Sequence, residues 1–426
     1  MGVDKAIIGA SYNDSGSLAA VENKIDNKAH EELSSTGISN HYFLRSADDS
    51  NSLRYSYSLR GIPIVAYSMM NFLKSSAKKI CVVGGDNEQK VFEHFIDYFN
   101  AKDRFVFAHE GYEWSFANSL KKGKAAIEAG EDELVLFNAG DLPHGFGLDS
   151  VLKDNDAKRF DYVIDLNCRE RIYGRMNFNG NKCAYNRRWH LPLNSRGEPI
   201  VIKETNLYLF TLDDAFIEKI DILFSARKTY DDEAGGKGQQ KGGRIKLIGN
   251  ILKKPKFWIN QLASPSPLTY LLLRGTAKYT GLKHRPHIIR PGHLSDLATL
   301  FLGRKTKIKA KHNNWGFLAD IDSAEDLMFN ECLMMADDPS KIYPYWNELK
   351  GFGDSLREVG IPIVNDFPEY LNEWFSRFSL LKDNVPFDSK GNFIPPDTNN
   401  LVYKDLEKRV EIVRANRKTF VRKLKE

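Results

Sequence analysis

The stretch "ELVLFNAGDLPHGFG", residues 133–147, ends a short apolar run on a carboxylate. The run 134–139 has the composition of a buried strand, and Gly140, Asp141 and Pro143 follow it. Gly-Asp and Leu-Pro are ordinary turn residues, so one interpretation is that Asp141 only turns the chain. The other interpretation is that its carboxylate holds a ligand at the end of the strand.

The sequence before Asp141 alternates between strand and helix patterns. Short apolar runs predict strands, and apolar residues at helical spacing predict the helices between them. Strands separated by single helices predict an α/β fold with a mainly parallel sheet. Such sheets bind ligands beyond the carboxyl ends of their strands, which favours the ligand-holding interpretation of Asp141. The predicted strands are 6–8, 78–85, 103–110 and 134–139, and the predicted helices are 63–75, 88–100 and 113–130.

The later part of the chain no longer alternates regularly between strand and helix patterns. Residues 161–167 and 199–212 have strand patterns, and the glycine-rich stretch 234–243 lacks the spacing of a phosphate-binding loop. The C-terminal part is mostly helical in pattern. We therefore divide the chain into an α/β domain, residues 1–330, with insertions at 10–53 and 226–310, and a helical C-terminal extension, residues 331–426.

Composition indicates a globular protein of a reducing compartment. The four cysteines are scattered without a CxxC pair, so neither a zinc site nor a disulfide framework is predicted. The N-terminal sequence lacks a signal-peptide pattern, and no stretch approaches the roughly 20 apolar residues of a membrane span. We expect a cytoplasmic protein, with peripheral attachment to a membrane left open.

Positive charge is concentrated in one segment. Residues 241–310 hold 15 Lys or Arg and one acid, Asp296, which gives this segment +14 and leaves −9 for the rest of a chain of net charge +5. The segment either packs on the acidic body of the protein or lies on an anionic membrane surface, since residues 245–262 mix lysines with apolar residues. Nucleic-acid binding is not expected, because no binding motif accompanies the charge.

Several short motifs, in a fixed order, resemble the nucleotidyltransferase superfamily of the molybdenum-cofactor guanylyltransferase and sugar-phosphate nucleotidyltransferase type. "RGIPIVAYSMMNFL" resembles the family's "GKP" helix start, and Arg54 stands where the family has a lysine, nine residues before Pro63. Ser119 and Gly123 have the family's spacing in the third helix. "NAGDLP" resembles the metal-binding aspartate motif, and "ADIDSAEDL" resembles the closing motif "DIDTPEDL". The resemblance covers roughly residues 1–330.

This resemblance implies a Rossmann-like domain of the GT-A type and a Mg²⁺-dependent reaction. An oxyanion of a phosphorylated small molecule, such as a sugar or polyol phosphate, attacks the α-phosphate of a nucleoside triphosphate, and pyrophosphate leaves. Carboxylates suit Mg²⁺, a hard cation. The implied metal ligands are Asp141, Asp320 and Asp322, the implied catalytic residues are Arg54 and Asp141, and the implied nucleotide contacts are Gly9, Ala10, Gly16, Ser119 and Gly140.

The sequence departs from the family pattern near its start. The first loop, "GASYNDSGS", has no arginine, and 44 residues, Ala10 to Leu53, separate the first strand from Arg54. This separation is much longer than in the family. Arginine keeps the charge of the family's lysine but differs from it in shape and hydrogen bonding. An inactive relative that docks on a membrane or a partner is therefore one alternative.

The acceptor side is marked by basic residues. Arg169 and Arg171 begin an arginine-rich stretch, and Lys203 lies in a predicted strand that resembles the acceptor-binding strand of related enzymes. Arginines suit an anionic acceptor, although a solvated basic loop explains them equally well. A GT-A glycosyltransferase that uses a nucleotide sugar is the second alternative, but "GDLPHG" lacks the second acid of the D-x-D motif of such enzymes.

Overall fold

The computed structural model describes slightly less than half of the chain. The described residues are 2–10, 58–111, 115–154, 156–157, 160–168, 189–192, 199–220, 295, 298–299, 302–312, 320–321, 330, 333–334 and 338–361.

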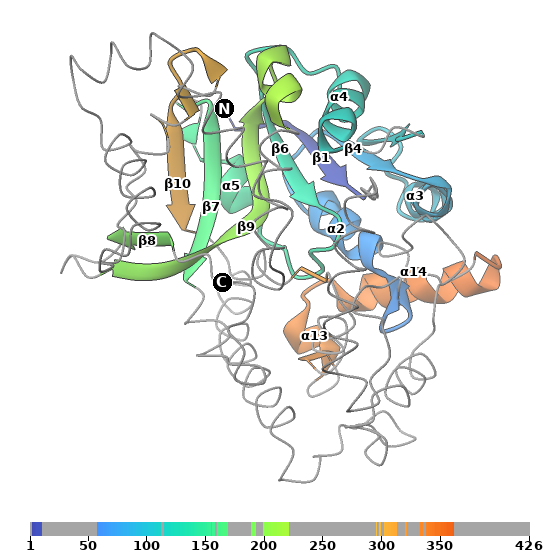
Figure 1. Cartoon of the computed structure of the whole chain (residues 1–426). Coiled ribbons are helices and arrows are strands. Elements are labelled where there is room, and N and C mark those ends of the chain that lie inside the picture. The colour runs from blue at the N-terminus through green and yellow to red at the C-terminus, as the bar shows by residue number, and fades with distance from the viewer. Residues whose placement is uncertain are drawn as a thin grey trace, which may run out of the picture.

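A single large sheet forms the centre of the described part of the chain (Figure 1). Its strands lie in the order β10-β7-β9-β6-β1-β4-β5, with β8 paired to β9. Neighbours are parallel except around β9, which is antiparallel to β6, β7 and β8. The predicted α/β class with a mainly parallel sheet is confirmed. The strands are β1 (Lys5–Gly9), β4 (Lys79–Gly84), β5 (Phe105–His109), β6 (Leu134–Ala139), β7 (Tyr162–Cys168), β8 (Trp189–Pro192), β9 (Pro199–Thr211) and β10 (Ile308–His312).

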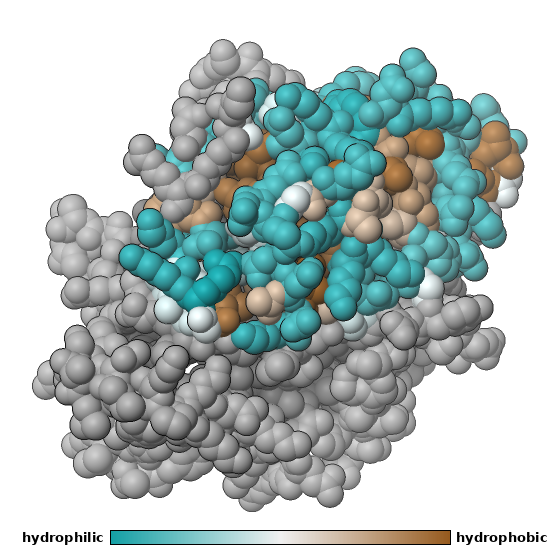
Figure 2. Space-filling model, turned by 90° about the horizontal axis from the view of Figure 1, so that it is seen from above, coloured by the Kyte–Doolittle hydropathy of each residue, from teal (hydrophilic) through white to brown (hydrophobic). Residues whose placement is uncertain are grey.

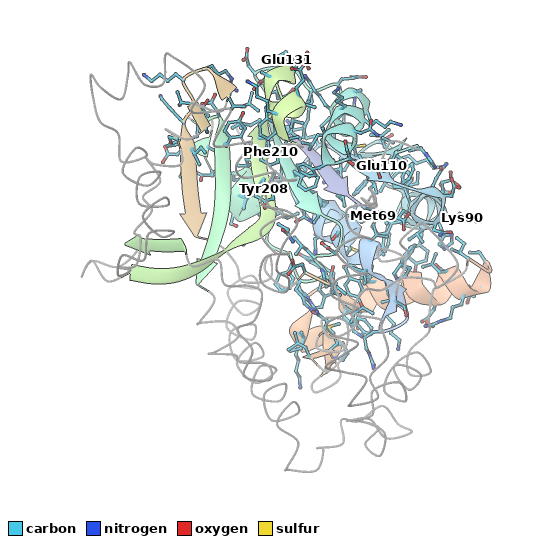
Figure 3. The ribbon with its side chains drawn as sticks, in the orientation of Figure 1. Met69, Lys90, Glu110, Glu131, Tyr208 and Phe210 are labelled. Atoms are coloured by element: carbon cyan, nitrogen blue, oxygen red, sulfur yellow. The ribbon has the colours of Figure 1, made fainter. Side chains whose placement is uncertain are left out.

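Helices cover both faces of the sheet and enclose two hydrophobic cores. Because side chains alternate along a strand, Ile8 of β1 faces the core below α2, α3 and α14, whereas Ile7 faces the core below α4. Met69 of α2 lies in the first core, and Tyr208 and Phe210 of β9 lie in the second (Figure 3). The helices are α2 (Ile64–Leu73), α3 (Asp86–Tyr98), α4 (Phe116–Ala126), α5 (Asp149–Leu152), α13 (Pro339–Ile342) and α14 (Trp346–Glu358).

A tight hairpin introduces α2. Strands β2 (Ser58–Leu59) and β3 (Ile62–Pro63) are joined by Arg60 and Gly61, both with positive φ, 56° and 72°. Two central residues with positive φ are typical of the hairpin turn whose twist matches its strands, and glycine favours this conformation. The "RGIP" motif thus fixes where α2 begins.

Helix α2 is buried on all sides rather than on one. Helical spacing places Val65, Met69, Phe72 and Leu73 on one face, yet every residue from Ile64 to Phe72 is buried. The helix lies in the first core, where the C-terminal segment 338–361 also packs on it, because the Tyr343 hydroxyl donates to the Asn71 side chain at 2.8 Å. Phe352 of α14 is fully buried and lies 5.3 Å from Phe95, measured between ring centroids. The C-terminal segment therefore belongs to the first core.

An edge strand closes the sheet at β10. The predicted basic insertion extends to residue 310, whereas β10 begins at Ile308 and pairs with β7. Arg304, which precedes β10, fixes the start of this strand beside β7 and β9, because it forms ion pairs with Asp161, at 2.9 Å, and with Asp213. Similar ion pairs lie near the amino ends of other parallel strands. Figure 2 shows the molecule from this side, where the described surface is largely hydrophilic.

No helix in the described ranges has both the length and the apolar character that crossing a membrane requires.

Arg104 closes the C-terminal end of α2. Its guanidinium donates to the carbonyl oxygens of Leu73 at 2.8 Å, Phe72 at 3.2 Å, Ser75 at 2.9 Å and Ala77 at 2.5 Å. The last carbonyls of a helix have no partner within the helix, and the helix dipole favours a cation there. From the loop that precedes β5, Arg104 thus supplies donors to Phe72 and Leu73 at the end of α2 and to Ser75 and Ala77 just beyond it.

We expect Arg104→Ala to lower the free energy of unfolding by about 2–3 kcal/mol, because it removes charged hydrogen bonds and leaves several carbonyls without a donor. Lysine should restore only part of this stability, since its ammonium cannot reproduce the planar fork. Urea denaturation measures both changes. Arg357→Ala is the matched control, because Arg357 forms an exposed ion pair with Asp354 at 3.0 Å. Equal losses in the two alanine variants would contradict the capping role of Arg104.

Candidate functional site

The candidate site lies at the carboxyl ends of β1 and β6. From β1 the sheet grows toward β4 and β5 on one side, while β6 lies on the other side, so the strand order reverses between β1 and β6 (Figure 1). Open α/β sheets bind ligands at this kind of switch point. The two strand ends are joined there, because the Gly140 amide donates to the Gly9 carbonyl at 2.8 Å.

Two buried side chains of α2 form hydrogen bonds to the turn after β6. The Ser68 hydroxyl donates to the Gly140 carbonyl at 3.0 Å, and the Asn71 amide donates to the Pro143 carbonyl at 3.3 Å. Asp141 lies between these two anchored carbonyls and is 1% exposed. The two interpretations of Asp141 are therefore compatible, since the same turn that reverses the chain holds its carboxylate at the edge of the sheet.

The second carboxylate motif meets the first at this turn. The Ile321 amide donates to the Asp141 carbonyl at 3.1 Å, which places the backbone of 320–321 directly beside the turn. The Asp320 carboxylate accepts a hydrogen bond of 2.8 Å from the side chain of Asn206, an interior residue of β9 whose neighbour Leu207 pairs with Asn138 near the end of β6. Two aspartates that are far apart in the sequence thus lie at one switch point, and their role as metal ligands stays a prediction. Asp322 lies outside the described residues.

The first strand reaches the site through Gly9 and Ala10. A Cβ atom on Gly9 would lie 2.6 Å from the Phe137 ring, so only glycine fits against β6 there. The buried Ala10 donates its amide to the Val83 carbonyl at 2.8 Å. Both residues lie where the predicted nucleotide loop begins, whereas Gly16 falls outside the described residues.

Ser119 is part of a buried pair at the end of β5. Its hydroxyl lies 2.6 Å from a carboxylate oxygen of Glu110, and Ser119 and Glu110 are 2% and 1% exposed. Glu110 follows β5 and lies between this strand and α4 (Figure 3). The pair is two strands away from β1 in the sheet order. Gly123, the partner of Ser119 in the predicted motif, serves packing, because a Cβ atom there would lie 2.7 Å from Ile7.

Glu110 was not among the predicted site residues. The signal that singled out Asp141, an acid directly after an apolar strand, is also present in "RFVFAHEG". An acid at the end of an apolar strand therefore occurs twice, and Asp141 differs from Glu110 in standing between the turn residues Gly140 and Pro143.

The structure does not test the remaining predicted residues. Arg54, Arg169 and Arg171 lie outside the described residues. Lys203 lies in β9, where its backbone pairs with Asn167 of β7. Among the described residues, no group of three or more His, Cys, Asp or Glu side chains is arranged to hold a metal ion.

These features define the class of the molecule. The described part of the chain is a Rossmann-like α/β protein with two aspartates at the topological switch point of its sheet.

No family model matches the sequence, and no curated protein matches it. One similar solved structure is 4-diphosphocytidyl-2C-methyl-D-erythritol synthase from Anaerococcus prevotii, with 12% identity, 78% of this chain and 96% of that chain covered, and a TM-score of 0.36. Another is a hypothetical transferase from Thermus thermophilus, with 14% identity, 76% and 99% covered, and a TM-score of 0.38. At such scores neither similarity defines a family for this chain.

Proposed function

We propose that this protein is a Mg²⁺-dependent nucleotidyltransferase. It transfers a nucleoside monophosphate from a nucleoside triphosphate to a phosphorylated small molecule, with a sugar or polyol phosphate as the acceptor. An acceptor phosphate oxygen forms a bond to the α-phosphorus, the bond between the α-phosphorus and the bridging oxygen breaks, and pyrophosphate leaves. The observation that carries the proposal is the hydrogen bond between Ile321 and Asp141, which joins two carboxylate motifs at the switch point.

The side chains at this point fit a hard cation. Asp141 and Asp320 offer carboxylate oxygens, and Asn206 fixes the orientation of Asp320. Mg²⁺ is commonly held by one or two carboxylates with phosphate oxygens and water as its other ligands, so a site with few protein ligands suits it. A bound Mg²⁺ would neutralise charge on the triphosphate. We propose Asp141 and Asp320 as its ligands, with Asp322 as a third candidate.

The other roles follow from the motif order and are proposed with it. Arg54 would contact the triphosphate, and the loop that includes Gly9, Ala10 and Gly16 would donate backbone amides to it. Gly140 would contact the nucleotide beside this loop, and Ser119 would contact the base or the ribose. The geometry also gives Ser119 a structural role, because its hydroxyl holds the Glu110 carboxylate. Arg169, Arg171 and Lys203 would bind the acceptor.

The test is a pyrophosphate-release assay with each of the four nucleoside triphosphates, Mg²⁺ and a panel of sugar and polyol phosphates. We expect release that needs one triphosphate, one acceptor and Mg²⁺, and that stops when EDTA is added. Calorimetry with each triphosphate measures binding separately. If no triphosphate binds, the proposal fails. Turnover of a nucleotide sugar without pyrophosphate would instead indicate a glycosyltransferase.

Attachment of residues 241–310 to an anionic membrane remains a prediction. Sedimentation of the protein with liposomes, with and without anionic lipid, tests it. Binding that needs anionic lipid and weakens with salt is the expected result, whereas equal sedimentation in both cases would contradict it.

A further inference from the structure

We propose that Tyr343, in the C-terminal segment 338–361, is a positioning residue for the turn that carries Asp141. The inference rests on the proposed function for its catalytic consequence, but its structural part stands on contacts in the described residues. It gives the C-terminal segment a part in the site, although the segment lies beyond the region that resembles nucleotidyltransferases.

Three groups link Tyr343 to the turn. The Tyr343 hydroxyl lies 2.8 Å from the side-chain oxygen of Asn71, and the side-chain nitrogen of Asn71 donates to the Pro143 carbonyl at 3.3 Å. Tyr343 is 0% exposed and Asn71 is 3% exposed, so water does not compete for these groups. A second acceptor, the Tyr67 carbonyl, is more distant from the hydroxyl, at 3.3 Å. The single proton of the hydroxyl therefore serves Asn71.

This arrangement determines which way the Asn71 amide faces. A carboxamide has a donor end and an acceptor end, and the tyrosine donor favours the orientation in which the oxygen faces Tyr343 and the nitrogen faces the turn. Without that donor, the buried Asn71 oxygen would lose its hydrogen-bond partner, which costs free energy and weakens the hold of the Asn71 side chain on the Pro143 carbonyl. Tyr343 thus stabilises the one orientation of Asn71 that anchors the turn.

Tyr67 provides a matched control. It is also 0% exposed, and its ring packs edge-on against that of Tyr343 with 5.2 Å between the centroids. Its hydroxyl, however, donates to the Leu59 carbonyl at 2.8 Å, in the β2–β3 hairpin and away from the turn. Tyr67→Phe and Tyr343→Phe therefore remove the same buried group from the same cluster, and only the second acts on Asn71.

The first measurement is hydrogen exchange of the full-length protein, followed by mass spectrometry of the peptide that covers residues 140–146. We expect Tyr343→Phe to raise amide exchange in this peptide by about tenfold, the size of effect that loss of one buried hydrogen bond produces on a local opening. Tyr67→Phe should leave it unchanged. Equal exchange in the wild type and Tyr343→Phe, or an equal rise in both variants, would overturn the proposal.

The second measurement is the Mg²⁺ dependence of pyrophosphate release. Tyr343→Phe should raise the Mg²⁺ concentration for half-maximal rate about tenfold, as loss of a supporting partner of a metal ligand commonly does. In an Asn71→Ala background, Tyr343→Phe should add little, because the pair acts as one unit. Full additivity would overturn the relay. If the wild type releases no pyrophosphate, the proposed function fails, while the exchange measurement still decides the positioning role.

Discussion

Asp141→Asn is expected to lower the rate of pyrophosphate release by about 10²–10⁴-fold, since a metal ligand supplies several kcal/mol of transition-state stabilisation. Asparagine forms turns as readily as aspartate, so the chain reversal after β6 is preserved. Removing a buried charge should leave the unfolding temperature unchanged or raise it. Loss of activity together with an intact fold would separate the ligand role of Asp141 from its role in the turn.

Asp103→Asn is the control for this variant. It makes the same chemical change at an exposed residue before β5. This residue lies at the amino end of the strand, whereas Asp141 follows the carboxyl end of β6. We expect wild-type rates from it. If Asp141→Asn retained wild-type activity, Asp141 would be a turn residue only, and the metal site proposed at the carboxyl ends of β1 and β6 would be wrong.

The largest effect on stability is expected from Phe352→Ala. Phe352 is fully buried in α14, and its ring lies 5.3–5.7 Å from the rings of Phe95, His94, Tyr98 and Phe99, all in or directly after α3. Truncation of such a core aromatic lowers the free energy of unfolding by about 3–5 kcal/mol. Thermal and urea unfolding of the full-length protein measure the loss.

Tyr98→Ala is the comparison, because Tyr98 belongs to the same aromatic cluster but is 46% exposed. Its loss should be much smaller, about 1 kcal/mol, the value of an aromatic contact at a surface. If both variants unfold like the wild type, α14 is not part of the core. A single cooperative transition in the wild type is expected, since α14 and the sheet share one hydrophobic cluster.

The sequence was informative where local chemistry and fold agree. Strand β6 was predicted with its observed bounds, because an apolar run is stopped by turn residues at a strand end. Motif order named Asp141 and Asp320 together, and the structure places the backbone of Ile321 beside Asp141, while the role of the two acids as metal ligands stays a prediction. The burial of α2 on all sides was not predictable, because part of its cover comes from Tyr343, 272 residues after its hydrogen-bond partner Asn71. Spacing within one helix does not show which distant element will pack on it.

Strand β10 was concealed for a different reason. It lies at the end of the strand order, and "IKAKH" carries two lysines in five residues. Edge strands commonly carry lysine because charge discourages pairing with other chains. A protective feature of an edge strand was therefore indistinguishable from the end of a basic insertion.

The late position of β10 in the sequence also has a consequence for synthesis. β7 begins at Tyr162 and its parallel partner at Ile308. At roughly 5–20 residues per second, a ribosome needs about 7–30 s to make the chain between them. Throughout that interval the outer edge of β7 in the nascent chain lacks its β10 partner. Protection of this edge by a chaperone would matter most in those seconds, before Arg304 can dock on Asp161 and secure the last strand.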